Sequence, residues 1–203
     1  MKIQKKGWTM THSIIKPDNC ALAFTIPLDE ESFKQKEKVP DREYTKETRW
    51  ELYEKKIAGI YEKMKSNFQQ LGVNIFYNVT LDCFKGLLDG EIDVVILFAH
   101  FRNNDSGLYK PGIEFFDGFA TIPEIVDVVP YNFSGILDLT VCNPTTLVVK
   151  LKEKNRDYLI KSGFGNATPV VWMGFYLALF KYLHDNDSTY IKALEETVKV
   201  FHT

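Results

Sequence analysis

Hydrophobic residues follow two patterns along the chain, short continuous runs and longer stretches with helical spacing. Continuous apolar runs cover residues 20–28, 93–100 and 136–142, and such runs are typical of parallel strands buried on both faces. Apolar residues three and four positions apart predict a long helix over residues 47–71, ended by Gly72. Further helices are expected over residues 81–88, 144–153, 168–184 and 188–201, with shorter strands at 73–79 and 157–161. Strands that alternate with helices predict an α/β fold with a mainly parallel sheet.

Two local motifs and one polar stretch complete this pattern. Residues 112–120 predict a β-hairpin whose tight turn is Asp117-Gly118. Thr121 and Glu124 have the spacing of a capping box, so a short helix is expected over residues 121–126. Residues 29–46 are polar and highly charged, and we expect an exposed loop or insertion there.

Length and composition fit one domain and narrow the choice of partners. The chain has 203 residues, enough for a core that needs no metal or disulfide, and we expect a single domain over all of them. The formal net charge of −2 provides no basic field for nucleic acid or anionic lipid. The sequence contains no apolar window of about 18 residues, so no transmembrane helix is expected. The three cysteines form no CxxC pair, and the charged first residues lack a secretory signal, so we expect a cytoplasmic protein.

Two of the apolar runs end in candidate catalytic residues. His100 ends one run and Cys142 ends another, and in open parallel sheets chemistry gathers at the carboxyl ends of the strands. A thiol beside an imidazole is a nucleophile–base pair for attack on a carbonyl carbon. A helix starting at Asn143-Pro144 would place its positive end near the sulfur and favour the thiolate. From the residues alone, a cysteine that acts as a small core hydrophobe and a histidine satisfied by its neighbours form the competing interpretation.

A longer series of motifs surrounds these two residues. It comprises the strand DVVILFAH, the hairpin GIEFFDGFATIPEIVDVVP, the strand GILDLTVCNP and the tail ATPVVWMGFYLALFKYLHDNDSTYIKALEETVKVF. Its order and spacing, from about residue 73 to residue 201, resemble a CHAT domain, a caspase-like cysteine peptidase domain related to separases. The resemblance implies a caspase-like three-layer sandwich with a mainly parallel central sheet, a cysteine endopeptidase activity, and no metal or organic cofactor.

The resemblance also assigns roles to residues. By it, Cys142 is the nucleophile, His100 is the general base or acid, and the backbone N–H groups of Phe101 and Cys142 hold the oxyanion. The family commonly has glycine where this chain has Phe101, and an acidic or small residue where it has Asn143. A catalytically inactive CHAT-like module that binds or signals to a protein partner is therefore the second hypothesis.

Proteins of this type often serve in bacterial conflict or programmed proteolysis. Many stay latent until a partner or a cleavage event orders the active-site loops. By the resemblance, the partners are a protein substrate and an activating protein, and the charged residues 29–46 are a candidate place for such control.

Residues just before Cys142 bear on the substrate. Asp138, Thr140 and Cys142 lie two positions apart and share one face of the predicted strand. In caspase-like peptidases such residues help to form the pocket for the side chain before the cleaved bond, so Thr140 would line it and Asp138 could attract Lys or Arg. A carboxylate that pairs inside the sheet is an equal alternative for Asp138.

Other site classes find little support in the sequence. The clusters at residues 29–31 and 185–187 lack calcium-loop spacing, and His12, His184 and His202 lack the spacing of zinc ligands. No metal site is expected. A flavodoxin-like signalling domain would need an acidic cluster or a phosphate-binding loop at the strand ends, and the sequence has neither.

Overall fold

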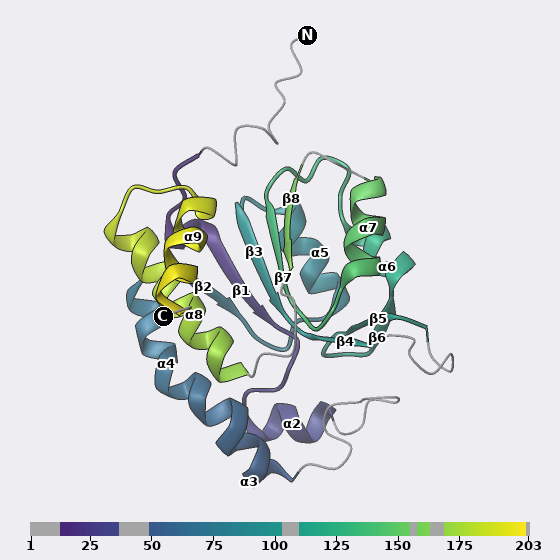
Figure 1. Cartoon of the computed structure of the whole chain (residues 1–203). Helices are drawn as coiled ribbons and strands as arrows, with labels where there is room; N and C mark the ends of the chain where they lie inside the picture. The colour runs from purple at the N-terminus through teal and green to yellow at the C-terminus, as the bar shows by residue number, and fades with distance from the viewer. Residues whose placement is uncertain (1–12, 37–48, 103–109, 155–157, 163–168, 202–203) are drawn as a thin grey trace.

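The computed structural model describes residues 13–36, 49–102, 110–154, 158–162 and 169–201 (Figure 1). Five strands form a central sheet in the order β2-β1-β3-β7-β8, and every pair of neighbours runs parallel. The strands are β1 (Cys20–Phe24), β2 (Asn74–Phe76), β3 (Val94–Phe98), β7 (Ile136–Thr140) and β8 (Leu159–Ser162). The α/β fold with a parallel sheet is therefore confirmed.

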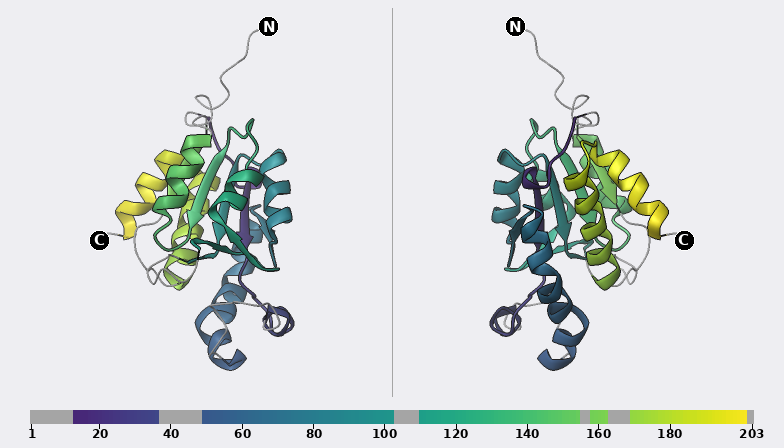
Figure 2. Two further views of the ribbon diagram at one scale, coloured as in Figure 1. Left: turned by 90° about the vertical axis from the view of Figure 1, so that its right-hand side faces the viewer. Right: turned by 90° about the vertical axis from the view of Figure 1, so that its left-hand side faces the viewer.

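Helices cover both faces of this sheet (Figures 1 and 2). One face carries α4 (Gly59–Gln70), α8 (Pro169–Asp185) and α9 (Tyr190–Phe201), and the other carries α5 (Leu81–Asp89), α6 (Ile122–Val128) and α7 (Thr145–Lys154). The central strands feed both cores because successive side chains point to opposite faces. In β3, Ile96 and Phe98 join the first core, whereas Val95 and Leu97 join the second. This two-sided burial explains why the strand is a continuous apolar run.

The long helix expected over residues 47–71 is present with an irregular start. It consists of α3 (Trp50–Tyr53), a π-helical segment (Glu54–Ala58) and α4. Gly72 follows the helix with a φ of +81°, the left-handed conformation that glycine adopts without penalty at a helix end. Gly72 therefore ends the helix, as the sequence predicts.

A small antiparallel sheet continues from the carboxyl edge of the central sheet. It has the order β4-β5-β6, with β4 at His100–Arg102, β5 at Gly112–Glu114 and β6 at Phe119–Thr121. The predicted hairpin is confirmed, since the Phe115 N–H donates to the Gly118 carbonyl at 2.8 Å. The strand β4 is an addition that the sequence did not predict.

Residues 30–36 form a helix, α2 (Glu30–Lys36), where an exposed loop was expected. The Asp29 carboxylate accepts hydrogen bonds from the Ser32 N–H and hydroxyl, both at 2.8 Å, which caps the first turn. Phe33 packs against the rings of Trp50 and Tyr53 at centroid distances of 5.6 and 5.0 Å. The loop prediction is wrong for this part because one aromatic anchor and one cap suffice to fix a polar helix. The rest of the stretch, residues 37–46, lies outside the described residues.

The helix α2 lies beyond the edge at which the central strands end, as Figures 1 and 2 show. Of the helices in the described ranges, none is both long enough and apolar enough to cross a membrane.

Candidate active site

The two candidate catalytic residues follow neighbouring strands of the central sheet. In the parallel pair formed by β3 and β7, Phe98 lies opposite Thr140 as the last matched position. His100 and Cys142 each come two residues after that pair, so both leave the sheet at its carboxyl edge. Both residues are partly exposed. The register thus brings the two chain segments to one edge of the sheet, with each residue just beyond its strand rather than within it.

His100 is the first residue of β4 and lies opposite Glu114 of β5. Burial lowers the pKa of His100 from 6.5 to about 3, and the positive charge of Lys36 lowers it as well. The imidazole is therefore neutral at pH 7. A neutral ring can accept a proton from a thiol, but a pKa this low makes it a weak base.

Cys142 is held in the loop between β7 and α7. Burial raises the pKa of its thiol above 9.0. Asn143 follows with a φ of +46°, a left-handed conformation that asparagine tolerates better than most residues, and α7 begins at Thr145. The nearby helix end was expected to favour the thiolate. Loss of hydration acts in the opposite direction, and the thiol stays protonated at pH 7.

The backbone of Phe101 lies in β4 opposite Ile113. Its side chain is 6% exposed and packs in the core that contains Ile113, Phe115 and Leu139. The aromatic ring therefore has a structural role, and it orients β4 against the second face of the central sheet.

Asp138 and Thr140 take part in a buried network with the helices α8 and α9. The Asp138 carboxylate is 0% exposed and accepts a hydrogen bond from the Tyr190 hydroxyl at 2.8 Å. The hydroxyls of Thr140 and Tyr176 share a hydrogen bond of 2.6 Å. Burial and the negative charge of Asp138 raise the pKa of both tyrosines. The geometry favours the interpretation in which Asp138 pairs inside the fold, because its carboxylate has no surface through which to meet a substrate.

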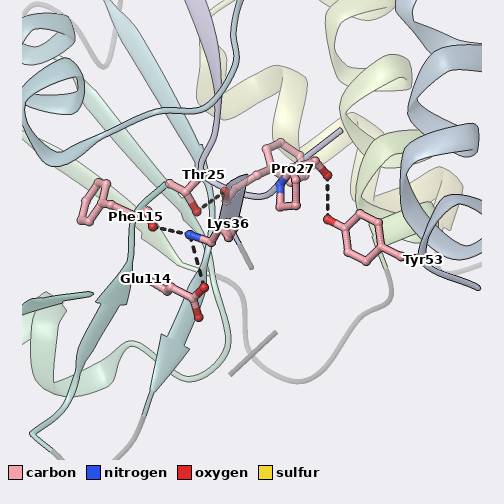
Figure 3. Close-up of polar contacts among 7 residues, drawn as sticks. Thr25, Pro27, Lys36, Tyr53, Glu114 and Phe115 are labelled. Carbon is pink, nitrogen blue, oxygen red and sulfur yellow. Dashed lines mark hydrogen bonds and ion pairs between the residues drawn. The ribbon is translucent and has the colours of Figure 1, made fainter. Parts of the chain in front are cut away.

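Sequence reasoning missed a charged pair beside His100. Lys36, the last residue of α2, is 1% exposed, and its ammonium lies 3.2 Å from a carboxylate oxygen of Glu114. Figure 3 shows the same ammonium donating to the Phe115 carbonyl. The only sequence signal was Phe33 in a charged stretch, three residues before Lys36. That spacing places both residues on one side of a helix.

The described residues offer no alternative metal centre, since no group of three or more His, Cys, Asp or Glu side chains among them is arranged to hold an ion. A hollow of about 460 Å³ lies at the opposite, amino-terminal edge of the sheet, lined by residues 88–93 and 132–135. It includes neither His100 nor Cys142.

Comparison with known proteins adds no assignment. The chain matches no protein-family model, and no curated protein matches it. The resemblance to CHAT domains therefore stays a prediction made from the sequence motifs.

Proposed function

We propose that the chain is a caspase-like cysteine endopeptidase that uses Cys142 as its nucleophile and His100 as its general base and acid. The observation that carries the proposal is the parallel register of β3 and β7, with Phe98 opposite Thr140. This register starts both candidate residues from one edge of the sheet, where open α/β sheets bind their ligands. The helices on both faces of a parallel sheet agree with the three-layer sandwich that a caspase-like fold requires.

The chemistry would proceed in two halves. His100 removes the thiol proton of Cys142 as the sulfur attacks the peptide carbonyl, and backbone N–H groups at Phe101 and Cys142 stabilise the oxyanion. The imidazolium then gives its proton to the departing amine, which leaves a thioester on Cys142. Water, deprotonated by His100, hydrolyses the thioester and restores the thiol.

The protonation states favour a latent form of this enzyme. A raised thiol pKa and an imidazole pKa of about 3 make proton transfer from Cys142 to His100 unfavourable as the site stands. Removing the positive charge of Lys36 and hydrating the imidazole would both raise the pKa of His100. Activation would therefore require a change near α2.

A non-catalytic protein-binding module is the second candidate, and two observations favour it. Phe101 replaces the glycine common in the family and is built into the core, and the neutral thiol and imidazole fit an inert site as well as a latent one. The two candidates differ in whether Cys142 ever becomes a nucleophile.

A thiol-trapping experiment tests the proposal. The wild type, Cys142→Ala and Cys83→Ala are treated with peptidyl chloromethyl ketones, and modified residues are identified by mass spectrometry. Cys83 is a matched control because it is also partly exposed and burial also raises its pKa. We expect slow modification of Cys142 in the latent wild type that persists in Cys83→Ala, and His100→Gln, treated in the same way, should slow it further because it lacks the base. Equal labelling of wild type and Cys142→Ala would exclude Cys142 as the nucleophile.

A further inference from the structure

A lysine ammonium occupies a buried site at the edge of the sheet. The Lys36 side chain is 2% exposed and that of Glu114 is 5% exposed. The ammonium lies 3.2 Å from the Glu114 carboxylate and donates to the Phe115 carbonyl (Figure 3). It also stands 5.7 Å from the centre of the Phe116 ring. A carboxylate, a carbonyl and a ring face together form a complete receptor for one cation.

The receptor and its occupant belong to different parts of the molecule. Glu114, Phe115 and Phe116 are consecutive residues of the hairpin, which is fixed by bonds from Phe115 N–H to the Gly118 carbonyl at 2.8 Å and from Phe116 N–H to the Val79 carbonyl at 3.0 Å. Lys36 comes from α2, a helix of seven residues. The receptor is therefore shaped by the hairpin and does not depend on α2 for its backbone.

Within the part of the chain that the structure describes, a small set of side chains attaches the helix α2. Asp29 caps it through Ser32, and the Asn78 side chain donates to the Ser32 hydroxyl at 2.9 Å. Phe33 contacts Trp50 and Tyr53. Burial lowers the pKa of Lys36, and Glu114 and Asp117 oppose that effect. Burying such a pair contributes little net stability, because desolvation offsets most of the attraction.

The receptor lies next to the candidate catalytic residue. Glu114 and His100 are direct partners across the antiparallel β4–β5 pair, and side chains of direct partners stand on the same face of the sheet. Lys36 therefore approaches the face of the β4–β5 ribbon that carries the imidazole.

We infer that Glu114, the Phe115 carbonyl and the Phe116 ring form a binding site for a lysine or arginine side chain, which Lys36 fills from within the chain. This inference rests on the proposed function for the identity of the ligand, a basic side chain of the protein substrate next to the cleaved bond. Lys36 then acts as an internal competitor, and displacement of α2 both empties the site and removes a positive charge from the surroundings of His100.

The cation site itself is tested without any catalysis. Lys36→Ala keeps the Cβ of the side chain and removes the three further methylene groups and the ammonium. The gap that remains has the size and shape of n-propylammonium. We expect n-propylammonium chloride at millimolar concentrations to raise the melting temperature of Lys36→Ala, with n-propanol and sodium chloride as controls. The rise should vanish in the double variant Lys36→Ala/Glu114→Gln. If Lys36→Ala is unfolded alone, recovery of its circular dichroism spectrum with n-propylammonium is the same readout. An equal response to n-propanol, or one unchanged by Glu114→Gln, would overturn the inference.

A second experiment separates this inference from the proposed function. Chloromethyl ketones of peptides ending in Lys or in Leu are compared on the wild type, Lys36→Ala and Asp29→Ala, the last of which loosens α2 without altering the receptor. We expect the Lys reagent to modify Cys142 at least about tenfold faster than the Leu reagent in both variants, and faster than in the wild type. Stabilisation by n-propylammonium with no modification of Cys142 by any reagent would reject the peptidase and keep the cation site. Modification of Cys142 with no preference for Lys would reject the substrate assignment and keep the peptidase.

Discussion

At the scale of single residues, burial controls the candidate site. The imidazole of His100 and the thiol of Cys142 are both kept neutral by loss of hydration. Lys36 adds a positive charge that further disfavours the imidazolium. Because the imidazolium and the thiolate would each have to form in a poorly hydrated setting, the arrangement suppresses the very ion pair that cysteine peptidases use. Any activity therefore depends on the exposure of this edge of the sheet.

The lowered pKa of His100 predicts a pH-dependent contribution to stability. In the unfolded chain His100 takes up a proton as the pH falls through 6.5, whereas in the folded chain it stays neutral down to about 3. Between these values the unfolded state binds one more proton, so the free energy of unfolding decreases as the pH is lowered, by up to about 1.4 kcal/mol per pH unit. Glutamine does not titrate, so we expect the stability of His100→Gln to depend less on pH between pH 6 and pH 4 than that of the wild type.

Urea titrations at a series of pH values measure the effect, with His184→Gln as the control because His184 is exposed. The wild type and His184→Gln should lose stability in parallel on acidification, and His100→Gln should lose less. Identical pH slopes in all three proteins would show that His100 titrates normally in the folded state.

At the scale of elements, the antiparallel ribbon β4-β5-β6 decides where His100 stands. Its strands β5 and β6 lie close together at Gly112, where an added Cβ would lie 2.1 Å from the Ala120 carbonyl oxygen and 2.8 Å from the Phe119 ring. We expect Gly112→Ala to lower the free energy of unfolding by about 2 kcal/mol or more, because β5 and β6 must separate to admit a methyl group.

Gly118 provides the matched control in the same hairpin. A Cβ there would meet nothing within 4 Å, so Gly118→Ala should change stability by less than about 0.5 kcal/mol. Both variants are compared by urea unfolding at pH 7. If Gly112→Ala proved as stable as Gly118→Ala, the close packing of β5 against β6 would be refuted.

The elements also show which features a sequence pattern can predict. Residues of β3 and β7 are buried on both faces, and this leaves an apolar run that identifies each strand. By contrast, β4 has only three residues, too few to show an alternation of polar and apolar positions. The sequence of α2 has the charged composition of a loop although Lys36 is buried. Glu114, the partner of Lys36, is distant in sequence, so only the fold reveals the pair. The same holds for Asp138, because a carboxylate on a strand is compatible with either a substrate pocket or a core network. Its hydrogen bond from Tyr190, 52 residues away, identifies the core network.

At the scale of the whole molecule, the structure combines a rigid sheet with a weakly attached helix at the edge that carries the candidate site. All residues of β1 and β3 are at most 5% exposed, and both strands have a paired strand on each side. The helix α2 has seven residues and is held by the contacts of Asp29, Phe33 and Lys36. Among the described residues, opening α2 therefore breaks few contacts compared with opening the sheet.

This difference predicts two levels of hydrogen-exchange protection. Amides of β1, β3 and β7 should exchange only through global unfolding, whereas amides of α2 should exchange through a local opening of much lower free energy. Asp29→Ala removes the cap and should speed exchange in α2 about fivefold, since a cap contributes about 1 kcal/mol, with little change in β3. Exchange measured by mass spectrometry at increasing sub-denaturing urea concentrations distinguishes the two routes. If α2 exchanged at the rate of β3 at every concentration, the helix would open only with the whole fold. Lys36 could then not leave its site to a substrate of the proposed peptidase without global unfolding.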